Sequence, residues 1–376
     1  MKTGTNKPPN FIYHDNELRE RGCWARIRGL FFIILVYRME FMQKSKYLLV
    51  FLLPILEVVS LHSHGIWSYI TVFWVFGLLP VLDLFAGPKP DNLSPEEREE
   101  VENDPYYRWA LRLTVPVHVF CGIYMLMQTS MELDTVTRVG RILSYGMMCG
   151  VIGINVGHEM FHRVRGLDAF LGKFLLTSSL YTHLYLEHLW GHHKTVGTPE
   201  DSSTARRGEW VYAFWIRSIL MGYIHAWQVG IKQSKGNPLK NEMVHYTLAQ
   251  AALLYLVYLF FGPSGLSAFF WASVVGWLLL ETVQYIQHYG LVRKKVSEYR
   301  YEDIKPCHSW NSDHVWGRAF LFELSRHSDH HYAPHKNFSL LDHHHNSPQL
   351  PTGYPGMMLI SLIPPLYFYL VHKRIS

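Results

Sequence analysis

Six apolar stretches, separated by polar connections, run through residues 47–287 and predict helices that cross a membrane. Most of them approach or reach the roughly 20 apolar residues that such a helix requires. Their bounds are 47–61, 67–83, 109–130, 139–157, 243–262 and 266–287. A further apolar stretch, 356–371, contains Pro364 and Pro365, so we interpret it as an interfacial or packing helix. The pattern predicts an all-α integral membrane protein with about six transmembrane helices.

The polar residues divide the chain into three parts. Residues 1–46 are polar and basic, and we interpret them as a cytoplasmic or interfacial segment rather than a signal peptide. Residues 47–290 hold the transmembrane helices, and residues 291–376 form a C-terminal region. Lysine and arginine gather in the N-terminal segment, in 84–108, in 163–241 and after residue 290. Because positive residues favour the cytoplasmic side, we expect these segments to face the cytoplasm.

Composition narrows the class of protein. Only 17% of the 376 residues are charged, below the roughly 25% of soluble domains, which argues against a soluble cytosolic enzyme. The mean hydropathy of +0.01 leaves room for a substantial polar portion beside the helices. None of the four cysteines stands in a C-x-x-C pair, so thiolate zinc sites and iron–sulfur clusters are not expected. The 23 histidines instead suggest a metal held by nitrogen and oxygen.

Histidine is concentrated in four clusters. They are an H-E-x-x-H run at 158–162, an H-L-W-G-H-H run at 188–193, the single His288, and an H-S-D-H-H run at 327–331. Nine imidazoles exceed what one ion accepts and suit two ions with four or five ligands each, and imidazole favours iron, copper, zinc or nickel. The predicted metal ligands are His158, His162, His188, His192, His193, His288, His327, His330 and His331.

Helical spacing suggests how these ligands group, because residues three or four apart share a helix face. The sets that meet this rule are His158 with His162, His188 with His192, and His327 with His330 and His331. His193 points about 100° away from His192 on a helix and is expected to reach a second ion.

Carboxylates are expected beside the ligands, where they orient the rings and offset the positive charge of two metal ions. The candidates are Glu159, Glu187, Asp201, Glu281 and Asp329. His183, five residues before His188, is expected to support the ligands rather than bind metal. The run His343-His344-His345 lies in a polar stretch, and we interpret it as a surface loop.

With these clusters the sequence resembles the membrane-bound non-haem di-iron alkane 1-monooxygenases, which are related to xylene monooxygenase and the membrane fatty-acid desaturases. The runs at 158–162, 188–193 and 327–331 match the three histidine boxes of that superfamily. More specific are Thr-Pro-Glu-Asp at 198–201, Ser-Trp-Asn-Ser at 309–312 and Leu-Pro-Thr-Gly-Tyr-Pro-Gly-Met at 350–357. The resemblance covers roughly residues 47–365, and desaturases do not share most of these flanking motifs.

Two departures from the family pattern concern the neighbourhood of the metals. The family reads Asn-Tyr-x-Glu-His-Tyr-Gly around the lone histidine, whereas this chain has Gln284 and Gln287 at the Asn and Glu positions. The first box contains the bulky Phe161 where alkane enzymes often have Gly. These differences predict an altered carboxylate arrangement and an altered pocket shape.

The resemblance implies hydroxylation of a terminal C–H bond, converting a medium-chain alkane to a 1-alkanol with two iron ions and O2 as cosubstrate. The stoichiometry is RH + O2 + 2 e⁻ + 2 H⁺ → ROH + H2O. The electrons are expected from a rubredoxin or a ferredoxin-type donor with its reductase, since the chain carries no flavin, haem or cysteine-iron motif. The expected location is a bacterial inner membrane, surrounded by lipid, with the catalytic region facing the cytoplasm and no nucleic-acid partner.

Two surfaces are expected to serve this reaction. An acidic electron carrier would be attracted by basic residues on the cytoplasmic side, although the same residues also fit a purely topological role. They are Arg206, Arg207, Lys232, Lys235, Arg293, Lys294 and Lys295. A hydrocarbon would reach the metals through a channel between helices, and the candidate channel residues are Trp67, Trp74, Phe76, Cys121 and Tyr124.

Four alternatives remain at this stage. A membrane zinc protease would use His158 and His162 as ligands and Glu159 as general base, but it leaves the other clusters unexplained. A metal transporter would place its ionisable residues across the bilayer midplane, whereas these clusters gather at one side. A fatty-acid desaturase or an alkylaromatic methyl hydroxylase shares the histidine boxes. Metal content separates the protease from the oxygenases, and product analysis separates the oxygenases from one another.

Overall fold

A computed structural model of the chain describes residues 44–375. The contacts divide the chain into Met1–Lys46 and Tyr47–Ser376, and the fold below concerns the second unit alone. The interpretation of residues 1–46 as a cytoplasmic or interfacial segment falls almost entirely outside the described residues.

Nearly all of the regular secondary structure in the described residues is helical. The helices in the first half are α2 (Leu52–His62), α3 (Ile70–Val72), α4 (Leu79–Ala86), α5 (Pro95–Asn103), α6 (Pro105–Thr129), α7 (Thr135–Met148), α8 (Gly157–Phe161) and α9 (Leu167–Ser178). Those in the second half are α10 (Leu184–Leu186), α11 (His193–Thr195), α12 (Val211–Gln233), α13 (Glu242–His288), α14 (Val315–Phe320), α15 (His327–Tyr332), α16 (Tyr354–Ser361) and α17 (Pro364–Val371).

Short 3-10 and π-helical segments extend or join these helices. The 3-10 segments are η1 (Lys46–Phe51), η2 (Gly65–Tyr69), η6 (Pro238–Lys240), η7 (Pro306–His308), η8 (Phe338–Leu340) and η9 (His372–Arg374), and the π segments are η3 (Phe73–Leu78), η4 (Cys149–Val156) and η5 (Glu187–His192). The only described strands, β1 (Lys295–Ser297) and β2 (Arg300–Tyr301), form one antiparallel hairpin.

Four helices are long and apolar enough to cross a membrane: Gly65–Ala86, Pro105–Thr129, Thr135–Phe161 and Glu242–His288. The last one bends at Gly262, whose φ of 65° is not helical and which precedes Pro263. This bend separates the predicted stretches 243–262 and 266–287. The first predicted stretch corresponds to η1 and the 11-residue α2, which is too short to span alone. The all-α membrane fold is therefore confirmed, whereas the count of six and the cytoplasmic side stay predictions.

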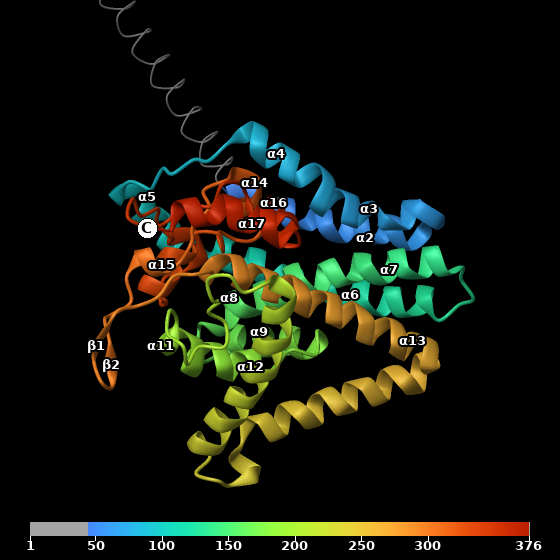
Figure 1. The fold of residues 1–376 in the computed structure, drawn as a ribbon. Helices are drawn as coiled ribbons and strands as arrows, with labels where there is room; N and C mark the ends of the chain where they lie inside the picture. The colour runs from blue at the N-terminus through green and yellow to red at the C-terminus, as the bar shows by residue number, and fades with distance from the viewer. Residues whose placement is uncertain (1–43, 376) are drawn as a thin grey trace, which may run out of the picture. The chain divides into compact units, whose positions relative to one another are not determined.

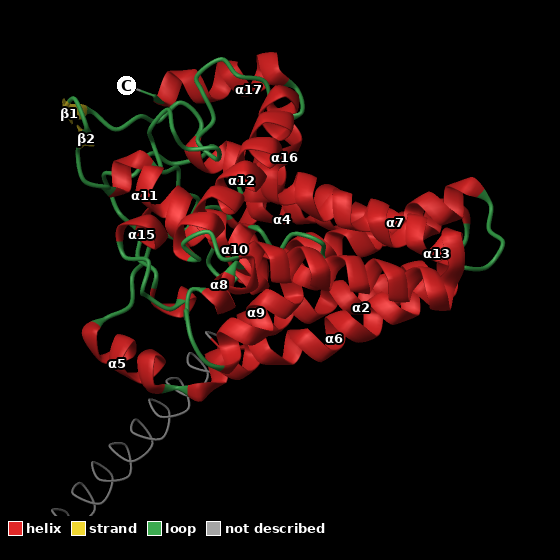
Figure 2. Ribbon diagram, turned by 90° about the horizontal axis from the view of Figure 1, so that it is seen from below, coloured by secondary structure: helices red, strands yellow, loops and turns green. Residues whose placement is uncertain are grey.

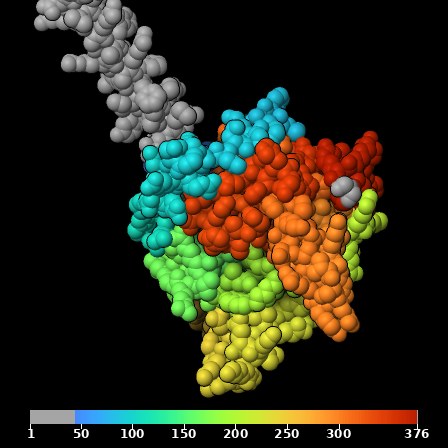
Figure 3. All heavy atoms as spheres, turned by 90° about the vertical axis from the view of Figure 1, so that its left-hand side faces the viewer, coloured from blue at the N-terminus to red at the C-terminus, as the bar shows by residue number. Residues whose placement is uncertain are grey.

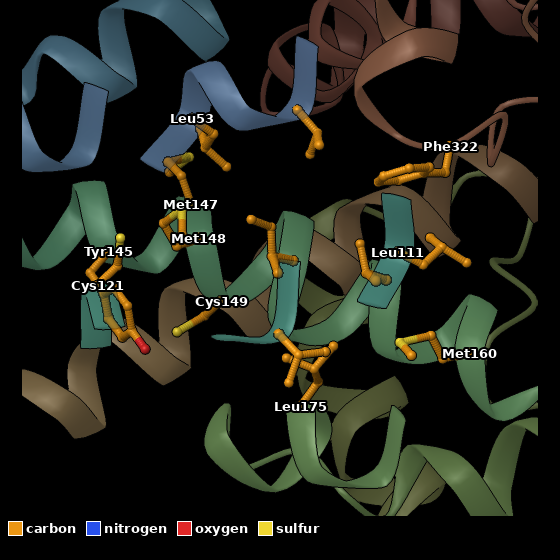
Figure 4. Close-up of a cluster of buried hydrophobic side chains, with 14 of the residues drawn as sticks. Leu53, Leu111, Cys121, Tyr145, Met147, Met148, Cys149, Met160, Leu175 and Phe322 are labelled. Carbon is orange, nitrogen blue, oxygen red and sulfur yellow. The ribbon is translucent and has the colours of Figure 1, made fainter. Parts of the chain in front are cut away.

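Glycines let the helix Thr135–Phe161 and α13 approach closely. A Cβ atom on Gly146 would lie 2.5 Å from the side chain of Val275, and one on Gly276 would lie 2.7 Å from Cys149 Cβ. Small residues at such crossings are typical of helix packing in membranes. Around this crossing, α2 and α6 add apolar side chains to the buried cluster that Figure 4 shows, including Leu53.

The histidine-bearing elements gather at one end of these helices. Figures 1 and 2 both show α8, α11 and α15 near one another, away from the far ends of α6 and α7. Figure 3 views the molecule from the side of α15 and the β1–β2 hairpin, where C-terminal segments form much of the surface. The apolar stretch 356–371 belongs to this region and forms α16 and α17, separated near Pro364. The C-terminal region therefore covers the histidine clusters.

Candidate metal centre

The nine predicted ligands lie in five elements or directly after one of them. His158 lies in α8 and His162 directly follows this helix, while His188, His192 and His193 follow one another through η5 and α11. Of the remaining four, His288 lies at the C-terminal end of α13, and His327, His330 and His331 lie in α15. The structure brings all nine side chains together in two groups, whose ligand atoms lie within 4.8 Å of one another in each group.

The five-histidine group consists of His158, His162, His188, His193 and His330. The Nε2 atoms of His158 and His188 lie 2.7 Å apart, and those of His188 and His193 lie 2.9 Å apart. His162 Nε2 lies 3.1 Å from His158 Nε2, and the ring of His330 is 4.6 Å from that of His162. His162 and His193 are half-buried, and the other three are buried.

The four-histidine group consists of His192, His288, His327 and His331, all of them buried. His327 Nε2 lies 3.0 Å from His288 Nε2 and 2.9 Å from His331 Nε2. His192 Nε2 lies 3.2 Å from His331 Nε2. As in the first group, the same ring nitrogen of several histidines points to a common centre.

This division differs from the grouping that α-helical spacing predicts. Residues 187–192 form a π-helix, whose wider turn brings residue i near residue i+5. His188 therefore lies with His193, and His192 joins the other group, so the predicted pairing of His188 with His192 is wrong. Helix α15 contributes to both groups, because His327 and His331 belong to one group and His330 to the other.

The donor set fits two metal ions better than a hydrogen-bonded network. An imidazole nitrogen carries either one proton or one lone pair in the ring plane, so it makes one good hydrogen bond. His158 Nε2 and His188 Nε2 each lie within 3.1 Å of two other Nε2 atoms. His330 Nε2 is buried and has no hydrogen-bond partner among the described residues. A cation among these lone pairs would satisfy all of them.

Burial favours the neutral form of five of the nine rings. It lowers the pKa of His188, His193, His327 and His331 well below the usual value, and neighbouring histidines lower it further. Burial also lowers the pKa of His330 to about 3. A neutral ring keeps the lone pair that a metal requires, so these histidines are ready to act as ligands at neutral pH.

Asp201 lies in direct contact with one of the groups. His192 Nδ1 donates a hydrogen bond to Asp201 Oδ2 at 2.9 Å, and Thr204 donates a second one at 2.6 Å. Burial alone would lower the pKa of His192, but the charge and hydrogen bond of Asp201 outweigh it and raise that pKa. Burial would likewise raise the pKa of Asp201, yet His192 and Thr204 hold it below its usual value. This pair fixes the ring so that Nε2 faces the metal position.

The other four predicted carboxylates bond elsewhere. Glu159 accepts a hydrogen bond from the backbone N–H of Phe338 at 3.2 Å. Glu187 accepts one from Ser202 at 2.7 Å, and its burial raises its pKa to about 7. Glu281 accepts one from the Tyr181 hydroxyl at 2.6 Å. Among the described residues, Asp201 is thus the only predicted carboxylate with a hydrogen bond to one of the nine histidines.

Asp329 accepts hydrogen bonds from a lysine and from one histidine of the run 343–345. Lys336 Nζ donates to Asp329 Oδ2 at 2.8 Å, and His344 Nε2 donates to Asp329 Oδ1 at 2.7 Å. His343 makes a similar bond to Asp313 at 2.7 Å. The three adjacent histidines lie in a loop outside both groups, where two of them hold carboxylates.

His183 does not touch the nine histidines. Its ring packs against Tyr181, with ring centroids 4.3 Å apart, and burial lowers its pKa to about 4. Phe161 packs between histidine rings and Tyr185, at 5.3 Å from the ring of His158 and 5.5 Å from that of Tyr185. Phe161 lines none of the cavities described below, so its bulk acts on packing around the ligands.

An apolar cavity lies between the helices beside the histidines. Its walls come from α2, the helix Gly65–Ala86, the helix Thr135–Phe161, the end of α13, and α14 and α16. Its lining residues are Leu53, Val75, Phe76, Leu79, Met147, Gly150, Val151, Asn155, Leu279, Leu280, Val283, Gly317, Phe320, Leu321, Leu324, Pro355 and Met358. Asn155 is the only polar side chain among them.

A smaller pocket, which we call the junction pocket, lies between this cavity and the metal centre. Four residues line both spaces: Asn155, Leu280, Val283 and Leu324. On its other side the junction pocket is lined by histidines of both groups, His158, His188, His192 and His327, and by Gln284 and Gln287. The apolar cavity and the histidines therefore lie on two sides of this pocket.

Of the five predicted channel residues, only Phe76 lines the cavity. Trp67 is 68% exposed, because its helix turns it away from the other helices. Trp74 packs against Phe320, with ring centroids 6.1 Å apart. Cys121 is buried in the apolar core, and the Tyr124 hydroxyl lies 2.7 Å from His62 Nε2. These four predictions are wrong for the cavity seen here.

Sequence reasoning missed Asn155 and the aliphatic residues Leu280, Val283 and Leu324 at the junction. Asn155 had a usable signal, because it is a polar residue in an apolar stretch three positions before His158. It donates from Nδ2 to the backbone oxygen of Leu321 at 3.1 Å, which ties η4 to the C-terminal region. Leucine and valine in a transmembrane stretch carry no such signal.

A basic surface pocket of about 580 Å3 opens next to the four-histidine group. Asp201 and Thr204 form part of its wall, and the exposed Arg206 and Arg207 stand at the same pocket. Because Asp201 also bonds His192, this pocket lies one hydrogen bond away from a predicted ligand.

Comparisons with known proteins agree with this geometry. The family model described as fatty acid desaturase matches residues 137–361. An alkane 1-monooxygenase 2 of Pseudomonas aeruginosa is 38% identical over 313 residues, which cover 80% of this chain and 82% of the relative. An alkane 1-monooxygenase of Ectopseudomonas oleovorans is 34% identical, covering 86% and 84%. The hydroxylase component of a xylene/toluene monooxygenase of Pseudomonas putida is 26% identical, covering 88% and 89%.

Proposed function

The chain belongs to the family of the membrane alkane 1-monooxygenases, and we propose that it hydroxylates a terminal C–H bond of a medium-chain alkane at two iron ions. The observation that carries this proposal is the placement of two convergent imidazole groups beside an apolar cavity. A hydrocarbon has no polar atom to bind, so an apolar space that leads to the metal position is the feature such a substrate requires.

The nine histidines would hold the metal, five around one ion and four around the other. When bound, the two irons supply what no side chain can, the reductive activation of O2 and the oxidation of an unactivated C–H bond. The neutral imidazoles supply nitrogen lone pairs, and Asp201 orients His192. The overall reaction is RH + O2 + 2 e⁻ + 2 H⁺ → ROH + H2O.

The cavity walls would determine which end of the substrate reacts. The chain of the alkane fills the apolar cavity, and Leu280, Val283 and Leu324 form a narrow passage that admits a terminal methyl group to the junction pocket. These side chains also exclude water from the space beside His158 and His188, which favours reaction with the C–H bond over competing reactions with solvent.

The electrons would come from a rubredoxin or a ferredoxin-type protein that docks at the basic surface pocket. Arg206 and Arg207 offer positive charge to an acidic carrier, which raises the rate of association. From the pocket wall, Asp201 and His192 give a short route to the four-histidine group, since a single hydrogen bond of 2.9 Å separates the carboxylate from the ring.

The protein is an integral membrane protein, and we propose the bacterial inner membrane with the metal centre near its cytoplasmic side. The lysine and arginine distribution supports this orientation. The β1–β2 hairpin carries Lys295 and Arg300 at the same end as the histidine groups. A carrier in the cytoplasm would then meet the basic pocket directly.

The position of Glu159 argues against a zinc protease. A general base must lie within hydrogen-bonding reach of the water that it activates, but Glu159 is bound to the backbone of Phe338 instead. Hydroxylation of an alkylaromatic methyl group or desaturation of a fatty acid would use the same ligands, so products must distinguish these reactions.

The test is oxidation of n-octane, p-xylene and a saturated fatty acid by purified, iron-loaded protein with a rubredoxin, its reductase and NADH. We expect 1-octanol as the main product, formed with one O2 per alcohol. Formation of an alkene from the fatty acid in place of 1-octanol, or a protein that binds zinc and oxidises nothing, would contradict the proposal.

A further inference from the structure

A small polar pocket lies behind the metal centre and is distinct from the apolar cavity. It has a volume of about 190 Å3 and lies between η5, α12 and α13. Its wall includes two carboxylates, Glu187 and Glu281, together with Tyr181, His183, Gln284 and three serines. We call it the carboxylate pocket. The space that this polar wall leaves is enough for about one water molecule.

Two acceptor atoms in this pocket have no partner among the described residues. They are Glu281 Oε2 and Gln284 Oε1, and both side chains are at least 95% buried. The other oxygen of Glu281 accepts hydrogen bonds from the Tyr181 hydroxyl at 2.6 Å and from Gln284 Nε2 at 3.1 Å. A buried acceptor without a donor costs free energy, which a water molecule or a proton on the carboxyl group would remove.

The carboxylate pocket adjoins the metal centre through one wall. Leu184 and Gln284 line both this pocket and the junction pocket, whose other walls include His158, His188 and His192. Along α13, Glu281, Gln284 and His288 stand at positions i, i+3 and i+7, so they share one face of the helix. Polar atoms therefore continue from Glu281 toward the histidines.

The charged and titratable groups around Glu281 leave it available for proton transfer. Tyr181 and His183 face it from the turn before α10, and Glu187 faces it from η5. On α12 the neighbouring cation is Arg217, which is already held by Glu209 at 2.7 Å and by the backbone oxygen of Ser202 at 3.0 Å. No ion pair binds Glu281 among the described residues, whereas Asp201 and Asp329 each have a cationic or histidine partner.

We propose that the carboxylate pocket holds water and that Glu281 passes protons from it to the metal centre. This inference rests on the proposed function, because that reaction consumes two protons for each O2. Each proton leaves Glu281 Oε2 as a new O–H bond forms on a water beside Gln284. The carboxylate then regains a proton from a hydronium ion in the carboxylate pocket, which becomes a neutral water molecule. The water beside Gln284 gives its extra proton to the metal centre, so Glu281 and both water molecules end each transfer unchanged. The two electrons come from the reduced rubredoxin or ferredoxin-type protein that is proposed above as the electron donor.

Glu281 is more important in this chain because the residue directly before His288 is not an acid. Residue 287 is a glutamine, whose Nε2 donates to the Tyr354 hydroxyl at 3.1 Å, and residue 284 is also a glutamine. Neither amide can release and regain a proton at neutral pH. Along this face of α13, Glu281 is the acid nearest to His288.

The test compares Glu281→Gln with Glu57→Gln in the full-length, iron-loaded protein. Glu57 is a suitable control because its carboxyl group is also buried and also has an oxygen without a hydrogen-bond partner among the described residues. It lines neither the carboxylate pocket nor the junction pocket. Two properties are measured in H2O and D2O: O2 uptake driven by dithionite without hydrocarbon, and the carboxylic acid C=O band in infrared difference spectra. Iron content of each variant verifies that the metal centre is intact.

We expect Glu281→Gln to keep its iron, to lower O2 reduction roughly tenfold or more, and to enlarge the solvent isotope effect. Glu281→Asp should restore part of the rate, and Glu57→Gln should behave as wild type. The infrared band that Glu281→Gln removes should shift in D2O within minutes, because water reaches the group, whereas the Glu57 band should not.

Two results would overturn the inference. One is a Glu281→Gln protein with full iron, wild-type O2 uptake and an unchanged isotope effect. The other is a Glu281 band that does not shift in D2O. Failure of the proposed function is recognised separately, since wild type would then reduce O2 without forming 1-octanol, and the comparison of O2 uptake would still decide the role of Glu281.

Discussion

The two histidine groups use the same ligand atom, Nε2, in different surroundings. In the five-histidine group, His162 and His193 are half-buried, and no ring has a carboxylate partner among the described residues. In the four-histidine group every ring is buried, and His192 is bound to Asp201. One group therefore offers a metal ion more histidines, whereas the other offers fewer histidines and a charged group that orients one of them.

The largest effect is expected when a ligand is removed from the smaller group. His327→Ala leaves three imidazoles at one position, whereas His162→Ala leaves four at the other. We expect His327→Ala to lose about one of two irons per chain and His162→Ala to retain most of its metal. Activity of His327→Ala should fall by more than the roughly 100-fold that loss of a supporting carboxylate costs. Metal analysis and 1-octanol formation check both, and equal metal loss in the two variants would remove the proposed difference.

The next effect concerns the carboxylate that distinguishes the groups. Asp201→Asn keeps the shape but removes the charge beside His192, so the affinity of one of the two metal positions should fall about 10- to 100-fold. Asp329→Asn is the matched control, because Asp329 binds Lys336 and His344 and no predicted ligand. Titration with Fe(II) under anaerobic conditions measures the affinities. Similar losses in both variants would show that the charge of Asp201 has no special role.

A smaller effect should follow from narrowing the path that both groups share. Val283 lines the apolar cavity and the junction pocket, and Val283→Phe fills the passage. We expect kcat/KM for octane to fall roughly tenfold, because a substrate that fits an apolar pocket poorly loses about this factor. The iron content should not change. Trp67→Ala, at a residue 68% exposed, should leave kcat/KM at the wild-type value. An unchanged kcat/KM in Val283→Phe would show that the substrate takes another path.

The smallest effect is expected at the surface pocket beside the four-histidine group. Arg206→Glu with Arg207→Glu reverses two exposed charges, so KM for an acidic rubredoxin should rise roughly tenfold at low salt and less at high salt. Dithionite-driven turnover should not change, because it needs no docking. A matched control is Lys232→Glu with Lys235→Glu, at exposed residues that do not line the pocket. If the control raises KM equally, the net charge of the surface is sufficient and the pocket is not the docking site.

The sequence predicted the helices and the histidines better than their arrangement. Apolar length and histidine clustering are local features, so the long helices and the nine residues that meet in two groups were visible in the sequence. The pairing of His188 with His193 was not, because nothing in residues 187–192 marks a π-helix in place of an α-helix. The spacing of an α-helix therefore predicted the wrong histidine neighbours for His192.

The channel was predicted poorly for a related reason. Whether an apolar side chain faces lipid, the core or a cavity depends on helices far away in the sequence. Phe76 and Trp67 lie on the same helix, yet Phe76 faces the cavity and Trp67 faces outward. The passage at Leu280 and Val283 exists only because α13, η4 and Leu324 meet there. Composition could not distinguish these residues from ordinary packing residues.

We infer that the nine histidines hold two inequivalent irons, with five ligands at one and four at the other. Mössbauer spectroscopy of the protein loaded anaerobically with iron-57 tests it most directly, because each iron reports its own coordination. We expect about two irons per chain and two quadrupole doublets of equal area, one of which is lost in His327→Ala. A single zinc per chain, or one doublet that is insensitive to His327→Ala, would contradict the account.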